Sequence, residues 1–245
     1  MASVDTASTS VPAARAAVWE DFIDIFYAPS LVFARRAGGN FWIPFLVVTL
    51  VIGALFYLNS GVLQPVMDGE FNRAMAAAMR ANPRLTPEVA DQFRQTGIRL
   101  AQVAGFLFVP VAIFFTGNAL WLIGKLFESK QTYQAALVVA AYAWVPRILE
   151  GALNGLQGLF LDPSQLNGRF RLTFGVGRFF DPDTASPIFL ALIGRIDVFT
   201  IWVTILLAIG LSVTGGISRS RAALAAPLIW AAGALPILFQ ALRTR

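Results

Sequence analysis

The chain contains no cysteine and no histidine. Without cysteine it can form neither disulfides nor thiolate metal sites, and it carries no thiol to be acylated. Without histidine it lacks the commonest ligand of zinc, copper and haem and the commonest general base near neutral pH. We therefore expect no cofactor, no metal site and no catalytic residues, and we find no phosphate loop or nucleophile motif that would indicate an enzyme.

Charged residues are also scarce, at 13% of the chain against 57% hydrophobic residues, and the mean hydropathy is +0.66. The net charge of +5 comes from arginines, because Lys125 and Lys130 are the only lysines. These arginines are scattered, whereas a nucleic-acid surface shows a basic patch or stripe. The composition thus excludes a soluble domain and gives no sign of a nucleic-acid partner.

Long runs without charge are the dominant feature of what is present. Four have no charged residue at all, and a fifth is interrupted only by Arg147 and Glu150. About 20 apolar residues cross a bilayer as a helix, which predicts an all-α, polytopic transmembrane helix bundle with about five spans. We expect a disordered tail at 1–18 and a single membrane domain at 19–245, with spans at about 41–60, 98–124, 133–161, 196–216 and 222–242.

Three segments outside the spans have patterns of their own. Trp19 to Phe33 interleaves apolar and acidic residues and predicts a helix lying in the membrane interface. Residues 61–97 predict an extramembrane helical hairpin whose apolar stripe of Phe71, Met75 and Met79 packs on its own neighbour, on lipid or on a partner. The alternation that begins at Phe170 in the loop 162–187 allows a short β-hairpin.

The interrupted run holds the candidate intramembrane polar site. Arg147 and Glu150 are spaced i, i+3 and share a helix face, and an arginine at mid-span costs roughly 2.5–3.5 kcal/mol on insertion scales. Pro146 removes a backbone donor beside them, Tyr142 lies one turn earlier, and Asn118 of the second span is a possible cross-helix partner. Two hypotheses stay open: a cavity or ion path, and a structural pair that is buried or reaches the interface.

Two further sets of residues are candidates for contacts rather than chemistry. Gly151, Gly155 and Gly158 form a small-residue face that predicts close helix packing, with homodimerisation as the alternative. Arg195, Asp197 and Trp202 lie at the start of the fourth span, where charged and aromatic residues typically anchor a helix at the interface.

Several marker residues resemble the Yip family of Ypt-interacting, five-span membrane proteins. They are Phe26 to Pro29 with Phe33, Gln134 through Tyr142 to Pro146, and Arg195 to Trp202 leading to Gly210. The resemblance covers about residues 20–240 and implies a helical bundle with a cytosolic N-terminus. It also implies a small GTPase among the partners, and the Ala- and Arg-rich composition suggests the prokaryotic branch and a bacterial inner membrane.

These observations leave two functional hypotheses of different classes. The first is a non-enzymatic scaffold or membrane-organising, trafficking-related protein, with the bilayer, itself or other membrane proteins as partners. The alternative is a small transporter or permeation unit with its polar site at Arg147 and Glu150.

Overall fold

The computed structural model describes residues 17–82, 87–166 and 168–243, so the predicted tail at 1–18 lies almost wholly outside them. Within those ranges the chain is helical and has no strand, which confirms the predicted fold class. The helices are α1 (Val18–Tyr27), α2 (Pro29–Arg36), α3 (Trp42–Asn59), α4 (Gln64–Ala81), α5 (Pro87–Leu126), α6 (Tyr133–Ala143), α7 (Pro146–Phe160), α8 (Pro187–Ile193), α9 (Val198–Gly215), α10 (Arg219–Ala232) and α11 (Leu235–Arg243), with 3₁₀ turns η1 (Pro163–Gln165), η2 (Arg169–Leu172) and η3 (Val176–Phe179) between α7 and α8.

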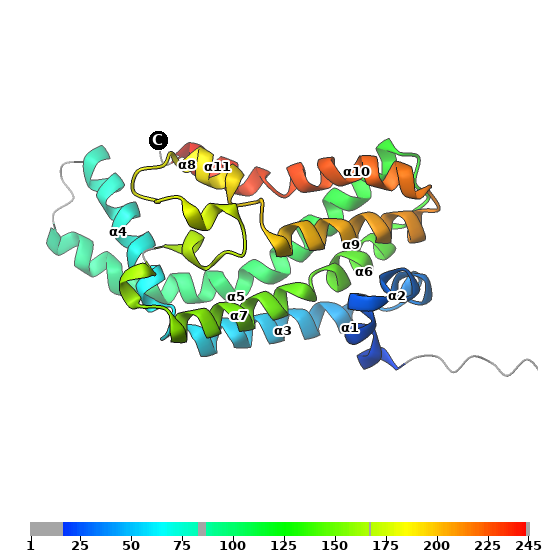
Figure 1. Ribbon diagram of the computed structural model, residues 1–245, viewed down its shortest axis with the longest axis horizontal. Helices are drawn as coiled ribbons and strands as arrows, with labels where there is room; N and C mark the ends of the chain where they lie inside the picture. Colours follow the sequence, from blue (N-terminus) through cyan, green and yellow to red (C-terminus); the bar gives the residue numbers. More distant parts are fainter. Residues whose placement is uncertain (1–16, 83–86, 167, 244–245) are drawn as a thin grey trace, which may run out of the picture.

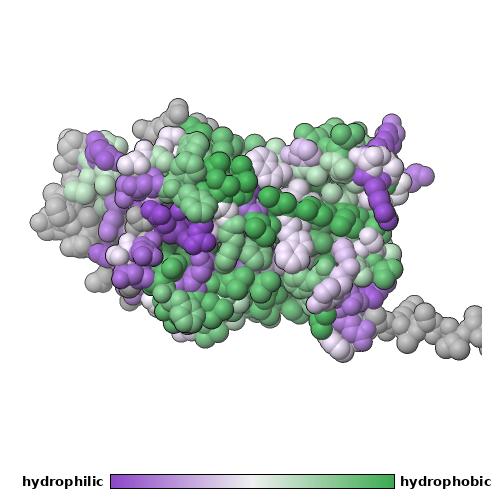
Figure 2. All heavy atoms as spheres, viewed as in Figure 1, coloured by the Kyte–Doolittle hydropathy of each residue, from purple (hydrophilic) through white to green (hydrophobic). Residues whose placement is uncertain are grey.

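Five helical segments are long and apolar enough to cross a membrane, as predicted. Their long axes run side by side between an end that carries α1 and α2 and an end that carries α4 (Figure 1). Figure 2 shows an apolar band across the middle of the molecule, with hydrophilic residues gathered towards both ends. The five segments are Trp42–Asn59, Val103–Leu126, Tyr133–Phe160, Val198–Gly215 and Arg219–Phe239.

Helix α6 occupies the centre of the bundle. All nine of its residues from Ala135 to Ala143 are buried, and it packs against both α5 and α9. Glycines allow this close approach: a β-carbon at Gly117 of α5 would lie 2.7 Å from Leu137, and one at Gly210 of α9 would lie 2.2 Å from Val139. Because alanine, valine and leucine fill α6, the middle of the bundle is protein rather than cavity.

Two of the crossings are interrupted, and a further break in the helices precedes the fourth. The third breaks between α6 and α7 just before Pro146, and the fifth breaks between α10 and α11 at Gly233, three residues before Pro236. Proline lacks the N–H for the preceding turn, so both breaks have a local cause. The link before the fourth crossing runs from the end of α8 at Ile193 to the start of α9 at Val198. Helix α8 packs against α11.

The predicted hairpin between the first two spans is present as α4 and the start of α5 (Figure 1). Arg94 Nη2 donates to Asp68 Oδ1 at 2.8 Å, and the Phe71 ring lies 3.5 Å from where a β-carbon of Gly97 would stand. Phe71 thus faces the neighbouring helix. At 40 residues α5 is about 60 Å long, twice the hydrocarbon thickness, so its first part must extend beyond the bilayer.

The loop after α7 differs from the β-hairpin that the alternation allowed. Phe170 and Leu172 lie in η2 and Val176 in η3, and the loop makes only a single antiparallel bridge, between Gly175 and Asp197, among the described residues. The N–H of Val176 donates to Ile196 O at 3.0 Å. The alternating residues fold into tight turns because their pairing partner is the link before α9 rather than a second loop strand.

The close approach of α6 and α9 yields a stability prediction. We expect Gly210→Ala to lower the stability of the detergent-solubilised protein by about 1–3 kcal/mol, because the added methyl overlaps Val139 in a packed core. Thermal unfolding followed by circular dichroism measures it. Gly38→Ala is the matched control, since nothing lies within 4 Å of its new β-carbon. Equal melting temperatures for the two variants would contradict the tight packing.

Candidate functional site

The charged pair predicted in the third crossing is formed at the start of α7. Arg147 Nη1 donates to Glu150 Oε2 at 2.6 Å, and Arg147 Nη2 donates to Thr200 Oγ1 of α9 at 2.9 Å. The side chains of Arg147 and Glu150 are 24% and 16% exposed. The pair therefore links α7 to α9, with the charge of each group offset by the other.

Neighbouring contacts fix how deep this pair lies. Gly155 of α7 packs against Asn59, the last residue of α3, and Asn59 Nδ2 also donates to Gly151 O at 3.0 Å. Arg147 precedes Gly155 by eight residues, which is about 12 Å along the helix. Since α3 has 18 residues and is about 27 Å long, Arg147 lies near the middle of the first span's length.

Arg195 adds a second guanidinium to the same region. Its Nη1 donates to Gly233 O and its Nη2 to Trp230 O, each at 2.9 Å, so it binds the carbonyl groups at the end of α10. The guanidinium also lies over the Trp230 ring, 5.3 Å from the centroid. A cation at a helix C-terminus is favoured by the helix dipole.

Asp197 completes the group of charges. Its Oδ1 caps α9 by accepting the N–H groups of Phe199 at 2.9 Å and Thr200 at 3.2 Å. The Asp197 side chain is buried, and its Oδ2 has no hydrogen-bond partner among the described residues. The Nε of Arg195 likewise has no hydrogen-bond partner there. We call Arg147, Glu150, Arg195, Asp197 and Thr200 the interruption cluster, because they lie at the break in the third crossing and at the link before the fourth, and Arg195 binds the break in the fifth.

Other residues that the sequence assigned to this site lie elsewhere. The hydroxyl of Tyr142 donates to Asp21 Oδ2 at 3.1 Å rather than to the charged pair. Asn118 is exposed, and its Nδ2 donates to Phe114 O in its own helix at 2.8 Å. Pro146 is the first residue of α7. The first N–H groups of a helix have no acceptor within that helix, so the N–H that proline lacks costs no helical hydrogen bond here.

The small-residue face of α7 is turned towards α3. Beta-carbons at Gly151, Gly155 and Gly158 would meet Leu55, Asn59 and Val62 respectively, at 3.4, 2.3 and 2.7 Å. This face therefore packs within the chain, and the same surface is not free for a second copy. Trp202 packs edge-to-face on Phe26 of α1, with ring centroids 5.4 Å apart. Interface anchoring by Arg195, Asp197 and Trp202 stays a prediction.

A second polar site, missed by the sequence analysis, holds α1 and α2 to the bundle. Asp21 of α1 is fully buried; its Oδ1 accepts Arg35 Nε and its Oδ2 accepts Arg36 Nε, both at 2.6 Å. Arg35 also pairs with Asp24. With Tyr142 of α6 as the remaining donor, we call Asp21, Arg35, Arg36 and Tyr142 the clasp.

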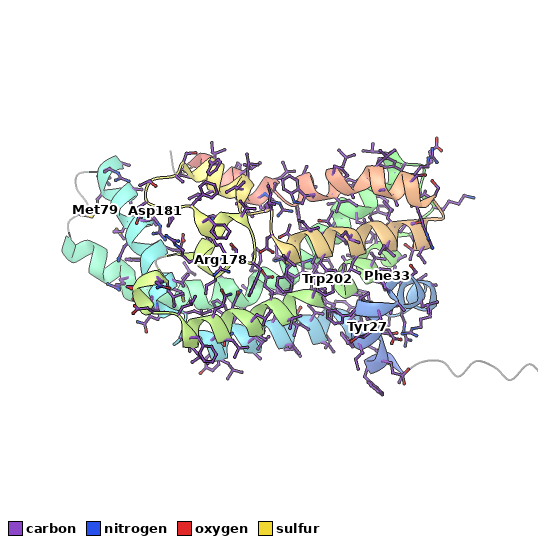
Figure 3. The ribbon with its side chains drawn as sticks, viewed as in Figure 1. Tyr27, Phe33, Met79, Arg178, Asp181 and Trp202 are labelled. Atoms are coloured by element: carbon purple, nitrogen blue, oxygen red, sulfur yellow. The ribbon has the colours of Figure 1, made fainter. Side chains whose placement is uncertain are left out.

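The clasp orients the amphipathic α1. Ile25 is buried and Phe22 and Phe26 pack on the core, whereas Trp19 and Tyr27 on the opposite face are 65% and 82% exposed. Tyr27 and the buried Phe33 are labelled in Figure 3. A signal for the clasp existed in the sequence: an acid at Asp21, one turn from Ile25 on the buried face, and the Arg35-Arg36 dipeptide just before the first span.

Comparison with known proteins agrees with this architecture. The family model described as the Yip1 domain matches residues 23–239. The chain belongs to the Yip1 domain family. No curated protein and no solved structure matches the chain. The matched range of the Yip1 domain begins inside α1 and ends inside α11, so the helices on both sides of every interruption belong to it.

The clasp of this Yip1 domain predicts unequal effects for two acids of α1, Asp21 and Asp24. Asp21→Asn removes a buried charge that two arginines share, which typically costs about 3–5 kcal/mol, whereas Asp24 is partly exposed and its pair is worth about 1 kcal/mol or less. We expect faster amide hydrogen exchange throughout α1 and α2 in Asp21→Asn, and rates close to wild type in Asp24→Asn. The clasp assignment fails if both variants exchange alike.

Proposed function

We propose that this Yip1 domain protein is a non-enzymatic membrane scaffold that acts through contacts with itself or with other membrane proteins. The observation that carries the proposal is the filled centre of the bundle, where nine consecutive residues of α6 are buried between α5 and α9. The outer faces are the available surfaces. Only 28%, 22% and 22% of the windows in the first, second and fifth spans are buried, and their apolar side chains face lipid or a partner.

A transporter is the second candidate, and one observation favours it. Interrupted helices that meet at a charged cluster near mid-depth are the arrangement by which many transporters bind substrate. Here the third and fifth crossings are broken, and the fourth begins after a non-helical link, around Arg147 and Arg195. Against this, the donors of Arg147 already bind Glu150 and Thr200, and those of Arg195 bind main-chain carbonyls, so a substrate would have to displace protein contacts.

Paired substitutions of Arg147 and Glu150 separate the two candidates. Arg147→Met alone leaves Glu150 as an unpaired buried charge and should cost about 3–5 kcal/mol. Arg147→Met with Glu150→Leu replaces the pair by apolar groups and should regain most of that stability. For a scaffold, the double variant keeps its co-purifying membrane proteins and complements a strain that lacks the protein. Arg219→Met, on the exposed start of α10, is the control.

The result that overturns the scaffold proposal is specific. A double variant that melts like wild type and retains its partners, yet fails to complement the deletion strain, would assign the function to the charged pair itself. A small GTPase, expected from the family resemblance, belongs among the partners sought in the same purification.

We further propose that the protein spans a bacterial inner membrane with the end that carries α1 and α2 in the cytoplasm. Because the chain has no cysteine, single introduced thiols can be labelled without background. Ser220 lies at the start of α10, Thr184 lies in the loop before α8, and both are exposed. In intact cells an impermeant maleimide should label Thr184→Cys and spare Ser220→Cys until the membrane is opened. The opposite pattern would reverse the orientation.

A further inference from the structure

A pocket of about 310 Å³ opens beside the end of α7. It is lined by Leu161, Ser164, Gln165, Arg171 and Arg178, with η2 and η3 supplying the two arginines. Its lining includes no carboxylate. Figure 3 labels Arg178 here, and Figure 2 shows strongly hydrophilic side chains in this region next to apolar surface. The lining chemistry is that of a site for an anion.

Both arginines make hydrogen bonds to uncharged groups. Arg171 Nη1 donates to the main-chain oxygen of Arg178 at 3.2 Å, which ties η2 to η3. Arg178 Nη2 lies 3.4 Å from Gln157 Oε1, and Gln157 Nε2 donates to Leu172 O at 3.0 Å. Gln157 of α7 thus fixes both turns, so the guanidinium groups are positioned before any ligand arrives.

Arg178 differs from Arg73 and Arg94 of the hairpin. Arg73 pairs with Glu70 and Asp183, and Arg94 pairs with Asp68. Among the ion pairs of the described residues none includes Arg178. A half-buried guanidinium without a carboxylate favours an external anion, and its planar fork suits the paired oxygens of a phosphate.

The surroundings favour a phosphate that carries an apolar tail. Phe160 and Phe179 are 84% and 80% exposed and adjoin the lining residues Leu161 and Arg178 in the sequence, and Leu159, two residues before Leu161, is 66% exposed. Exposed aromatic rings beside basic groups are typical of the headgroup level of a bilayer. Asp162 adjoins the pocket, and its Oδ1 accepts the N–H and the hydroxyl of Ser164 at 2.8 and 2.7 Å.

We propose that this pocket, on the end of the bundle opposite α1 and α2, binds a phosphate group, and that Arg171 and Arg178 are its ligands. A volume of about 310 Å³ holds a phosphate with a small substituent but no acyl chains. The larger pocket that shares Ser164, about 560 Å³, leaves room for a group attached to the phosphate. Two sources supply such a group: the headgroup of an anionic lipid and a free phosphate.

Native mass spectrometry of the full-length, detergent-solubilised protein tests the proposal with three probes. They are dioleoylphosphatidic acid, dioleoylphosphatidylcholine and inorganic phosphate, the last measured by its shift of the melting temperature. We expect phosphatidic acid to bind at least tenfold tighter than phosphatidylcholine, and Arg178→Gln to reduce that affinity at least tenfold. Arg169→Gln is the matched control: it removes the same charge from the same loop, but Arg169 lies over Phe170 and does not line the pocket.

The outcomes separate the sources and can refute the site. Binding of phosphatidic acid without a shift from inorganic phosphate identifies a lipid, whereas a phosphate shift that is lost in Arg178→Gln identifies a free phosphate. Undiminished binding in Arg178→Gln, or equal loss in Arg169→Gln, overturns the proposal. If Arg178→Gln melts early without ligand, Arg178→Lys keeps the charge and loses the fork, and it must bind less tightly than wild type while melting like it.

Discussion

Arg195 resolves the main physical constraint on this bundle, which is that a helix interrupted inside a bilayer must satisfy its freed backbone groups within the protein. At the end of α10 the carbonyls of Trp230 and Gly233 would otherwise face an apolar surrounding, where each unpaired group costs several kcal/mol. Arg195 donates to both. In return the carbonyls stabilise a guanidinium that has no carboxylate partner among the described ion pairs, so the break in the fifth crossing and the charge before the fourth depend on each other.

The same logic organises the neighbouring charges. Asp197 Oδ1 satisfies the first N–H groups of α9, and Arg147 is satisfied by Glu150 and Thr200. These contacts connect α7, α9 and α10 without passing through α6, which stays apolar and provides the packing that holds the helices around it. Polar contacts thus satisfy the groups that the breaks set free, while the close approaches at Gly117 and Gly210 set how near the helices lie.

The spans of the bundle could be predicted from the sequence because each is a run of consecutive apolar residues and needs no information on distant contacts. The predicted spans 41–60 and 133–161 nearly coincide with Trp42–Asn59 and Tyr133–Phe160, and the hairpin follows from the charges and proline between spans one and two. The clasp and the interruption cluster could not be assembled in the same way. Tyr142 and Asp21 are 121 residues apart, and Arg147 and Thr200 are 53 apart, so periodicity carries no information on either contact. Nearness in the sequence groups Tyr142 with Arg147, whereas helix geometry and the break before Pro146 turn the two side chains to different partners.

Helix α7 brings three of these features onto one rigid element. Arg147 and Glu150 lie in its first turns, Gly151 and Gly155 hold it against α3, and Gln157 positions the arginines of the proposed phosphate pocket. Because α7 is continuous from Pro146 to Phe160, a displacement at Gln157 is carried to Arg147 ten residues away. A phosphate that draws Arg178 away from Gln157 would therefore act on the interruption cluster through α7. The size of that effect is bounded by the ligand's difference in affinity between the two positions of the helix.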